Sequence, residues 1–143
     1  MTPDQARAAV YDEFLTQWAD ETPVILEGQA GPQAAEPEPG VKWVRVAFRN
    51  LGGGQLTLGA SGGRKYRRDA AALVQVFVPS VAGTGPGATL AHAARAIFEG
   101  KAITVGSERV EFNDGRITEV PLSGGERSLQ TNVEVRCTYD ETK

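Results

Sequence analysis

The sequence predicts a single α+β domain in which a mixed, mainly antiparallel β-sheet packs against two α-helices. Two segments carry large apolar residues at helical spacing, and several others alternate between apolar and polar residues. Glycine- and proline-rich turns join these segments without a regular strand–helix–strand repeat. A chain of 143 residues fits one domain with one core, so residues 1–143 are assigned to a single unit.

Two amphipathic helices are expected, the first beginning close to residue 1. Thr2 can cap this helix, Pro3 suits its first turn, and Gln5 lies three positions after the cap. The second helix is expected to end near Gly100 and to expose His92 on its polar face. The apolar stripes that would face the sheet are Val10, Tyr11, Phe14, Leu15 and Trp18 in the first helix and Leu90, Ala94, Ile97 and Phe98 in the second.

Strands are expected where β-favouring residues alternate with polar ones or form short apolar runs. These segments are residues 23–27, 43–50, 55–59, 72–78, 102–105, 110–112, 116–120 and 129–139. The glycines at 52–54 and the Asn-Asp-Gly sequence at 113–115 predict tight turns between strands. In the last strand, Cys137 and Tyr139 fall on the side that faces the core. Residues 28–40 lack large apolar side chains, which predicts a mobile loop.

The composition argues against several classes of function. The formal net charge is −3 and no long basic stretch occurs, so sequence-independent DNA binding is not expected. No apolar run approaches the roughly 20 residues that cross a bilayer, and no secretory pattern is present, so we expect no membrane partner. One histidine and one cysteine provide neither metal-ligand spacing nor a disulfide, so we expect no metal, no cofactor and a reducing cytoplasm.

Two glycine motifs could carry chemistry, and each has a plainer interpretation. Residues 59–63, GASGG, match the G-x-S-x-G elbow of hydrolases, but no helix is expected after Ser61, and His92 is the only candidate base. Residues 83–88, GTGPGA, match a dinucleotide-binding turn between a strand and a helix. A spacer before the glycines and the absence of a second parallel strand favour a simple turn. A small nucleotide-binding enzyme that uses residues 83–88 stays open as an alternative.

The sequence contains one basic cluster, which consists of Arg64, Lys65, Tyr66, Arg67 and Arg68. Its aromatic ring could stack on a partner while its charges meet carboxylates or phosphates. A solvated loop without a partner is an equally good interpretation. Cys137 lies among core-facing residues, so we expect a buried, inert thiol rather than an activated thiolate.

The order of segments along the chain is distinctive. Residues 72–79 read ALVQVFVP and are followed by GTG at 83–85 and by a helix that ends in IFEG at 97–100. A first helix, a variable loop and the basic segment precede them, and a late hairpin and a closing strand with an acidic tail follow. Over most of its length, apart from residues 28–40, the chain resembles bacteriophage tail-terminator proteins, the minor tail proteins that close the tail tube of long-tailed phages.

The resemblance implies a structural virion protein rather than an enzyme. Such a subunit forms a ring, typically a hexamer, that ends tail polymerisation and presents the head–tail joining surface. Its partners would be copies of itself, the tail-tube protein and a head–tail connector or stopper protein, with passive contact to DNA in the lumen. It would be found in the virion tail, after assembly in the bacterial host cytoplasm from a phage or prophage gene. The alternative within the same particle is a monomeric neck or adaptor protein, which never closes a ring.

By the same analogy, the basic cluster and the loop at 28–40 would contact neighbouring subunits, the tube, or DNA in the ring lumen. We therefore expect weaker assembly when Arg64, Lys65, Arg67 and Arg68 are replaced with serine. Assembly that is unchanged by these replacements would contradict a role for the cluster.

Overall fold

The computed structural model of the chain describes residues 1–28, 40–121 and 128–143. Nearly all of the predicted mobile loop at 28–40 therefore lies outside the described residues. The elements, in chain order, are α1 (Pro3–Trp18), β1 (Val24–Leu26), β2 (Trp43–Gln55), β3 (Lys65–Pro79), the short 3-10 helix η2 (Ser80–Ala82), α2 (Gly85–Phe98), β4 (Ala102–Val105), β5 (Glu108–Val120) and β6 (Ser128–Thr142). Neither α-helix in these ranges is long and apolar enough to cross a membrane.

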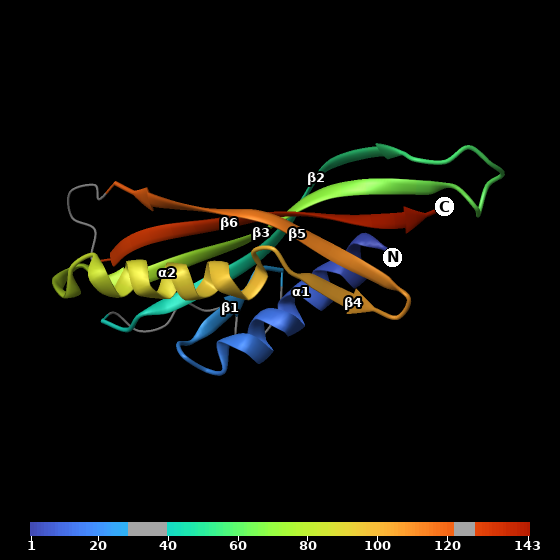
Figure 1. Ribbon diagram of the computed structural model, residues 1–143. Helices are drawn as coiled ribbons and strands as arrows, with labels where there is room; N and C mark the ends of the chain where they lie inside the picture. Colours follow the sequence, from blue (N-terminus) through green and yellow to red (C-terminus); the bar gives the residue numbers. More distant parts are fainter. Residues whose placement is uncertain (29–39, 122–127) are drawn as a thin grey trace.

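The strands form one six-stranded sheet in the order β1-β2-β3-β6-β5-β4. β1 runs parallel to β2, and every other neighbouring pair is antiparallel. Both α-helices lie against the same face of this sheet (Figure 1). The predicted fold class, a mixed and mainly antiparallel sheet packed against two α-helices in one domain, is confirmed.

The ends and faces of the helices follow the sequence pattern closely. The Thr2 hydroxyl accepts a hydrogen bond from the Gln5 backbone at 3.2 Å, and the Gln5 side chain accepts one from the Thr2 backbone at 2.8 Å, which completes the predicted cap. Both predicted apolar stripes are buried except for Leu15, which stays 43% exposed at the margin of its stripe. His92 is exposed on α2, as predicted.

The core lies between the helices and one face of the sheet. Phe14 stacks on Trp18 and Phe98 at ring-centroid distances of 5.0 and 6.1 Å, and Phe98 stacks on Phe112 at 4.8 Å. Small apolar side chains from alternate sheet positions fill the space below these rings: Val44, Val46, Ala70, Ala72, Val74, Val76, Val78, Val133 and Val135. Because burying one large apolar side chain contributes about 1.5–3 kcal/mol, apolar contact is what holds the helices on the sheet.

The prediction that the glycines at 52–54 end a strand is wrong. β2 continues through them to Gln55, with a register shift between Asn50 and Gly52, and residues 56–59, predicted as strand, lie in the loop that follows. Gly52 and Gly53 have φ values of +150° and +142°, which L side chains rarely adopt. β3 also begins earlier than predicted, at Lys65. The glycines therefore let a long hairpin bend instead of ending it.

The predicted turn at Asn113–Gly115 is also wrong, because these residues form an irregularity inside β5. The register with β6 shifts between Phe112 and Gly115, and the chain turns earlier, at residues 106–107. The Gly115 backbone N–H donates to Glu99 at 2.6 Å, and the Asn113 carbonyl accepts from Gly100 at 3.2 Å. These hydrogen bonds to the end of α2 hold the segment in the strand despite its local turn preference.

A glycine comparison tests the path of the hairpin. A β-carbon at Gly53 would collide with the Arg67 carbonyl and lie 2.9 Å from the Arg68 Cα, whereas one at Gly54 would meet nothing within 4 Å. We expect Gly53→Ala to lower the free energy of unfolding by about 1–3 kcal/mol and Gly54→Ala to change it by less than about 0.5 kcal/mol. Urea denaturation of both variants measures this, and equal midpoints would contradict the close approach of β2 to β3.

Candidate functional site

A three-stranded extension of the sheet projects past the two helices (Figure 1). It consists of residues 49–69 and 138–143, which we call the β-arm. All residues from 49 to 65 are exposed, and the C-terminal end of β6 runs along β3. Arg64 and Lys143 exchange two backbone hydrogen bonds of 3.0 and 2.8 Å, so the third strand supports the arm almost to its tip.

The side chains of β3 change character where the helix layer ends. Positions 70 to 78 place buried alanine and valine under the helices, while the same face of the β-arm carries Tyr66 and Arg68. Arg68 pairs with Glu141 at 2.6 Å and lies 5.0 Å from the Tyr66 ring centroid. The Tyr139 hydroxyl donates to the Asn50 side chain at 2.8 Å and so joins the outer strands of the arm. Tyr139 is the last core residue along this face, and the face beyond it is held by polar contacts.

The structure places four residues of the predicted basic cluster in β3 and Arg64 just before it, so the cluster is not a free loop. Arg67 makes two hydrogen bonds to Asp140, at 3.0 and 3.3 Å, and this carboxylate raises the pKa of Arg67. Arg68 is paired with Glu141. Among the described residues, Arg64 and Lys65 have no ion pair, although Arg64 donates to the Gly59 carbonyl at 2.7 Å. Half of the predicted positive charge is thus neutralised by the chain itself.

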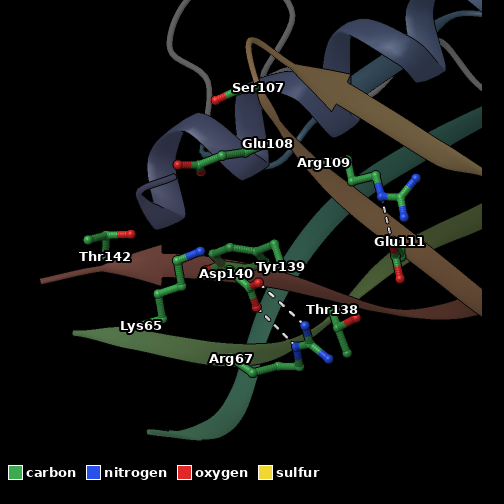
Figure 2. Close-up of a pocket in the computed structure, with 10 residues that line it drawn as sticks. All are labelled: Lys65, Arg67, Ser107, Glu108, Arg109, Glu111, Thr138, Tyr139, Asp140 and Thr142. Atoms are coloured by element: carbon green, nitrogen blue, oxygen red, sulfur yellow. Dashed lines mark hydrogen bonds and ion pairs between the residues drawn. The ribbon is translucent and has the colours of Figure 1, made fainter. Parts of the chain in front are cut away.

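A cavity of about 330 Å³ lies beside the β-arm, next to the turn between β4 and β5 (Figure 2). Its lining contains three basic and three acidic side chains, which are Lys65, Arg67, Arg109, Glu108, Glu111 and Asp140. Arg109 pairs with Glu111 at 2.7 Å, and the Met1 ammonium pairs with Glu108 and donates to the Asp140 carbonyl at 3.2 Å. The cavity is therefore a polar hollow in which the acidic and basic side chains are balanced.

The face of the sheet away from the helices carries an aromatic pair that the sequence analysis missed. Trp43 stacks on Phe77 with 4.2 Å between ring centroids, and the Arg45 guanidinium lies 5.3 and 5.7 Å from the two rings. Alternation did place Trp43 and Arg45 on the outward face of β2, but only the register of β2 with β3 brings Phe77 opposite Trp43. Trp43 is only 7% exposed, so the stack stabilises this face.

The two glycine motifs do not form the sites that their patterns predict. Ser61 lies in the loop between β2 and β3, with no helix after it, and His92 lies on α2, where its ring contacts Arg95 at 3.1 Å. The β-arm and α2 lie at opposite ends of the molecule (Figure 1). The hollow beside residues 83–87 measures only about 50 Å³ and includes Glu119, whose carboxylate would repel a phosphate. Gly87 faces Thr131 and Val78, so it serves close packing.

Cys137 lies in the core, as predicted. Burial raises the pKa of its thiol to about 12, with a smaller contribution from the charge of Asp69. Within the described residues, no three His, Cys, Asp or Glu side chains lie close enough together to hold a metal ion. Cys137 is therefore a small buried apolar residue in this structure.

The geometry defines a small α+β protein whose exposed features are a β-arm and a mixed-charge cavity. No protein-family model matches the sequence, and no curated protein matches it. Several solved structures match the chain, and one of them covers all of this chain and 98% of its own, with a TM-score of 0.65 and 20% sequence identity. The name of that protein states no function, and a likeness at this identity shows the shared fold alone.

The paired charges of the β-arm can be tested by comparing two arginines. Glu141 is only 12% exposed, so Arg68→Ala leaves a poorly solvated carboxylate whose one remaining ion partner among the described residues is Lys143, at 3.9 Å. We expect a loss of about 1–3 kcal/mol in the free energy of unfolding. Arg109→Ala removes a pair whose side chains are 65% and 51% exposed, so we expect less than about 0.5 kcal/mol. Equal losses in urea denaturation would refute a supporting role for Arg68.

The buried thiol predicts a specific response to alkaline pH. An unfolded cysteine ionises near pH 8.5, whereas the folded Cys137 keeps its proton up to pH of about 12. The contribution of the buried, protonated thiol to folding stability is therefore fully present below pH of about 8.5. It is lost as the pH rises toward 12, because only the unfolded chain gains free energy by ionising. We expect stability to fall less steeply between pH 8 and 11 in Cys137→Ala than in the wild type. Urea midpoints across this range measure the slopes, and parallel slopes would contradict burial of the thiol.

Proposed function

We propose that this protein is a structural subunit that forms a ring on the end of a phage tail tube, ends tail polymerisation and offers the head–tail joining surface. The proposal joins the resemblance to tail-terminator proteins with the surfaces of the fold. In this role the protein performs no catalysis, and it works by pairing with further copies of itself. The tail-tube protein and a head–tail connector or stopper are its other partners, and its place is the virion tail.

The observation that carries the proposal is a pair of open strand edges at opposite ends of the sheet. In the described part of the chain, β1 pairs with β2 only at residues 44–46, and the Tyr11 hydroxyl donates to the Glu27 carbonyl at 2.9 Å, just after the end of β1. Among the described residues, no strand pairs with the outer edge of β2 over residues 50–55.

At the other end of the sheet, β4 pairs only with residues 108–111 of β5. In the described part of the chain, residues 116–120 of β5 have no strand neighbour on that side.

Two different edges on one subunit favour head-to-tail association. Unpaired backbone groups on an exposed strand attract another strand. Because the two edges differ, a contact between them is heterologous, and heterologous contacts produce a closed ring when the rotation between subunits closes. A monomeric adaptor would need to protect these edges, whereas the described strands β1 and β4 cover only residues 44–46 of β2 and 108–111 of β5. The geometry therefore supports the ring over the monomeric alternative.

The charge distribution supports protein partners more than DNA. Arg67 and Arg68 are paired with acidic residues of β6, and the formal net charge is −3. Phosphate binding depends on cations that are free to replace counterions. Contact with DNA in the lumen would then be passive.

The mass of the protein in solution tests the proposed function. We expect light scattering after size exclusion to give one closed stoichiometry, a hexamer, over a broad concentration range, because a ring has no free edge left to extend. Tail-tube protein polymerised in the presence of this protein should also give shorter tubes with capped ends. A monomer at every concentration that leaves tube length unchanged would reject the proposal.

A further inference from the structure

The tip of the β-arm exposes apolar and basic side chains together. Leu58 is 95% exposed and Leu56 is 52% exposed, although both are large apolar residues. Arg64 and Lys65 lie on the other side of the same loop, and the Leu56 backbone N–H donates to the Lys65 carbonyl at 2.8 Å. Neither cation has an ion pair within the described residues. An apolar tip beside free positive charge is typical of a segment that inserts into a partner.

A groove with the complementary character lies on the same molecule, between α1 and β4. It has a volume of about 410 Å³ and is lined by Ala8, Ala9, Ile103, Val105 and polar neighbours. Asp12 and Glu13 are also among its lining residues, and neither carboxylate has an ion pair in the described part of the chain. The groove thus offers apolar side chains beside carboxylates that have no ion pair, whereas the tip offers leucines beside cations that have no ion pair.

The tip and the groove of one subunit cannot meet each other. The tip joins β2 and β3, whereas β4 is the strand at the opposite edge of the sheet, separated from β3 by β6 and β5. The β-arm also projects away from the helix layer that forms one wall of the groove (Figure 1). A contact between tip and groove must therefore join two copies of the chain. Such a contact is head-to-tail, the arrangement that a ring requires.

We propose that the tip of the β-arm of one subunit docks into the α1–β4 groove of the next subunit. This inference rests on the proposed ring, and it names a second contact between neighbours, in addition to the pairing of their strand edges. Leu58 and Leu56 fill the apolar floor of the groove, while Arg64 approaches Asp12 and Glu13. The tip is built on the supported hairpin of the β-arm, so it docks as a largely preformed element and loses little conformational freedom.

Disulfide trapping between two variants tests the contact directly. Leu58→Cys and Ala9→Cys are made separately on a Cys137→Ala background, mixed, and oxidised at a concentration where the protein associates. Intact mass measures the yields of the three disulfide-linked dimers. We expect the yield of the mixed dimer to exceed the share that random coupling of the two variants would give. The matched control replaces Leu58→Cys with Val81→Cys, because Val81 is 97% exposed but lies on η2, away from the β-arm. Equal trapping by the control would overturn the proposal.

Charge reversal gives a second readout that separates this contact from the proposed ring. We expect Leu58→Asp to weaken self-association about tenfold or more, because the contact would then have to bury a carboxylate where it now buries a leucine. Arg64→Glu and Asp12→Lys should each weaken it by a smaller factor, and the double variant should recover it. Closed rings that tolerate all three single changes would overturn this contact and leave the proposed function standing. Absence of association and of tube capping in the wild type would overturn both.

Discussion

The antiparallel pairing of β3 with β6 is the constraint on which the rest of the structure depends. A single register joins Lys65–Pro79 to Ser128–Thr142, with Val74 opposite Val133 in the core and Arg67 opposite Asp140 in the β-arm. Because side chains alternate along a strand, a slip of one residue would turn valines outward and charges inward. It would also separate Arg67 from Asp140. Core and β-arm are therefore specified by the same ladder, although they have opposite chemistry.

The β-arm exists because this ladder is longer than the helices that cover it. The 16 residues of α1 span about 24 Å, whereas the 15 residues of β3 span about 50 Å. One helical layer can therefore shield only part of the sheet. Where that shield ends, an apolar face would meet water, and the sequence there changes to Tyr66, Arg68 and Glu141. The charged pairs let a long sheet continue into solvent without a second core.

Elements whose stability is local could be predicted from the sequence, and those decided by distant contacts could not. The cap of α1 at Thr2, both helical stripes and the core face of β6 follow from spacing alone. The turns predicted at residues 52–54 and 113–115 fail, because the ladder with β3 and the hydrogen bonds to α2 outweigh local turn preference. The basic cluster could be identified, but its pairing with Asp140 and Glu141 depends on residues 73 positions away.

Neutralisation of the basic cluster changes what the β-arm can recognise. Carboxylates pair with Arg67 and Arg68, so the β-arm attracts acidic partners only weakly over long distances. Specificity then depends on short-range features. Those features are open strand edges and Leu58, which is 95% exposed at the tip. Both features act only at close contact, and both select a partner by the shape of its surface more than by its charge. Recognition of this kind is what the proposed ring requires, because an identical neighbour in a symmetric assembly presents a fixed geometry whereas a flexible polyanion does not.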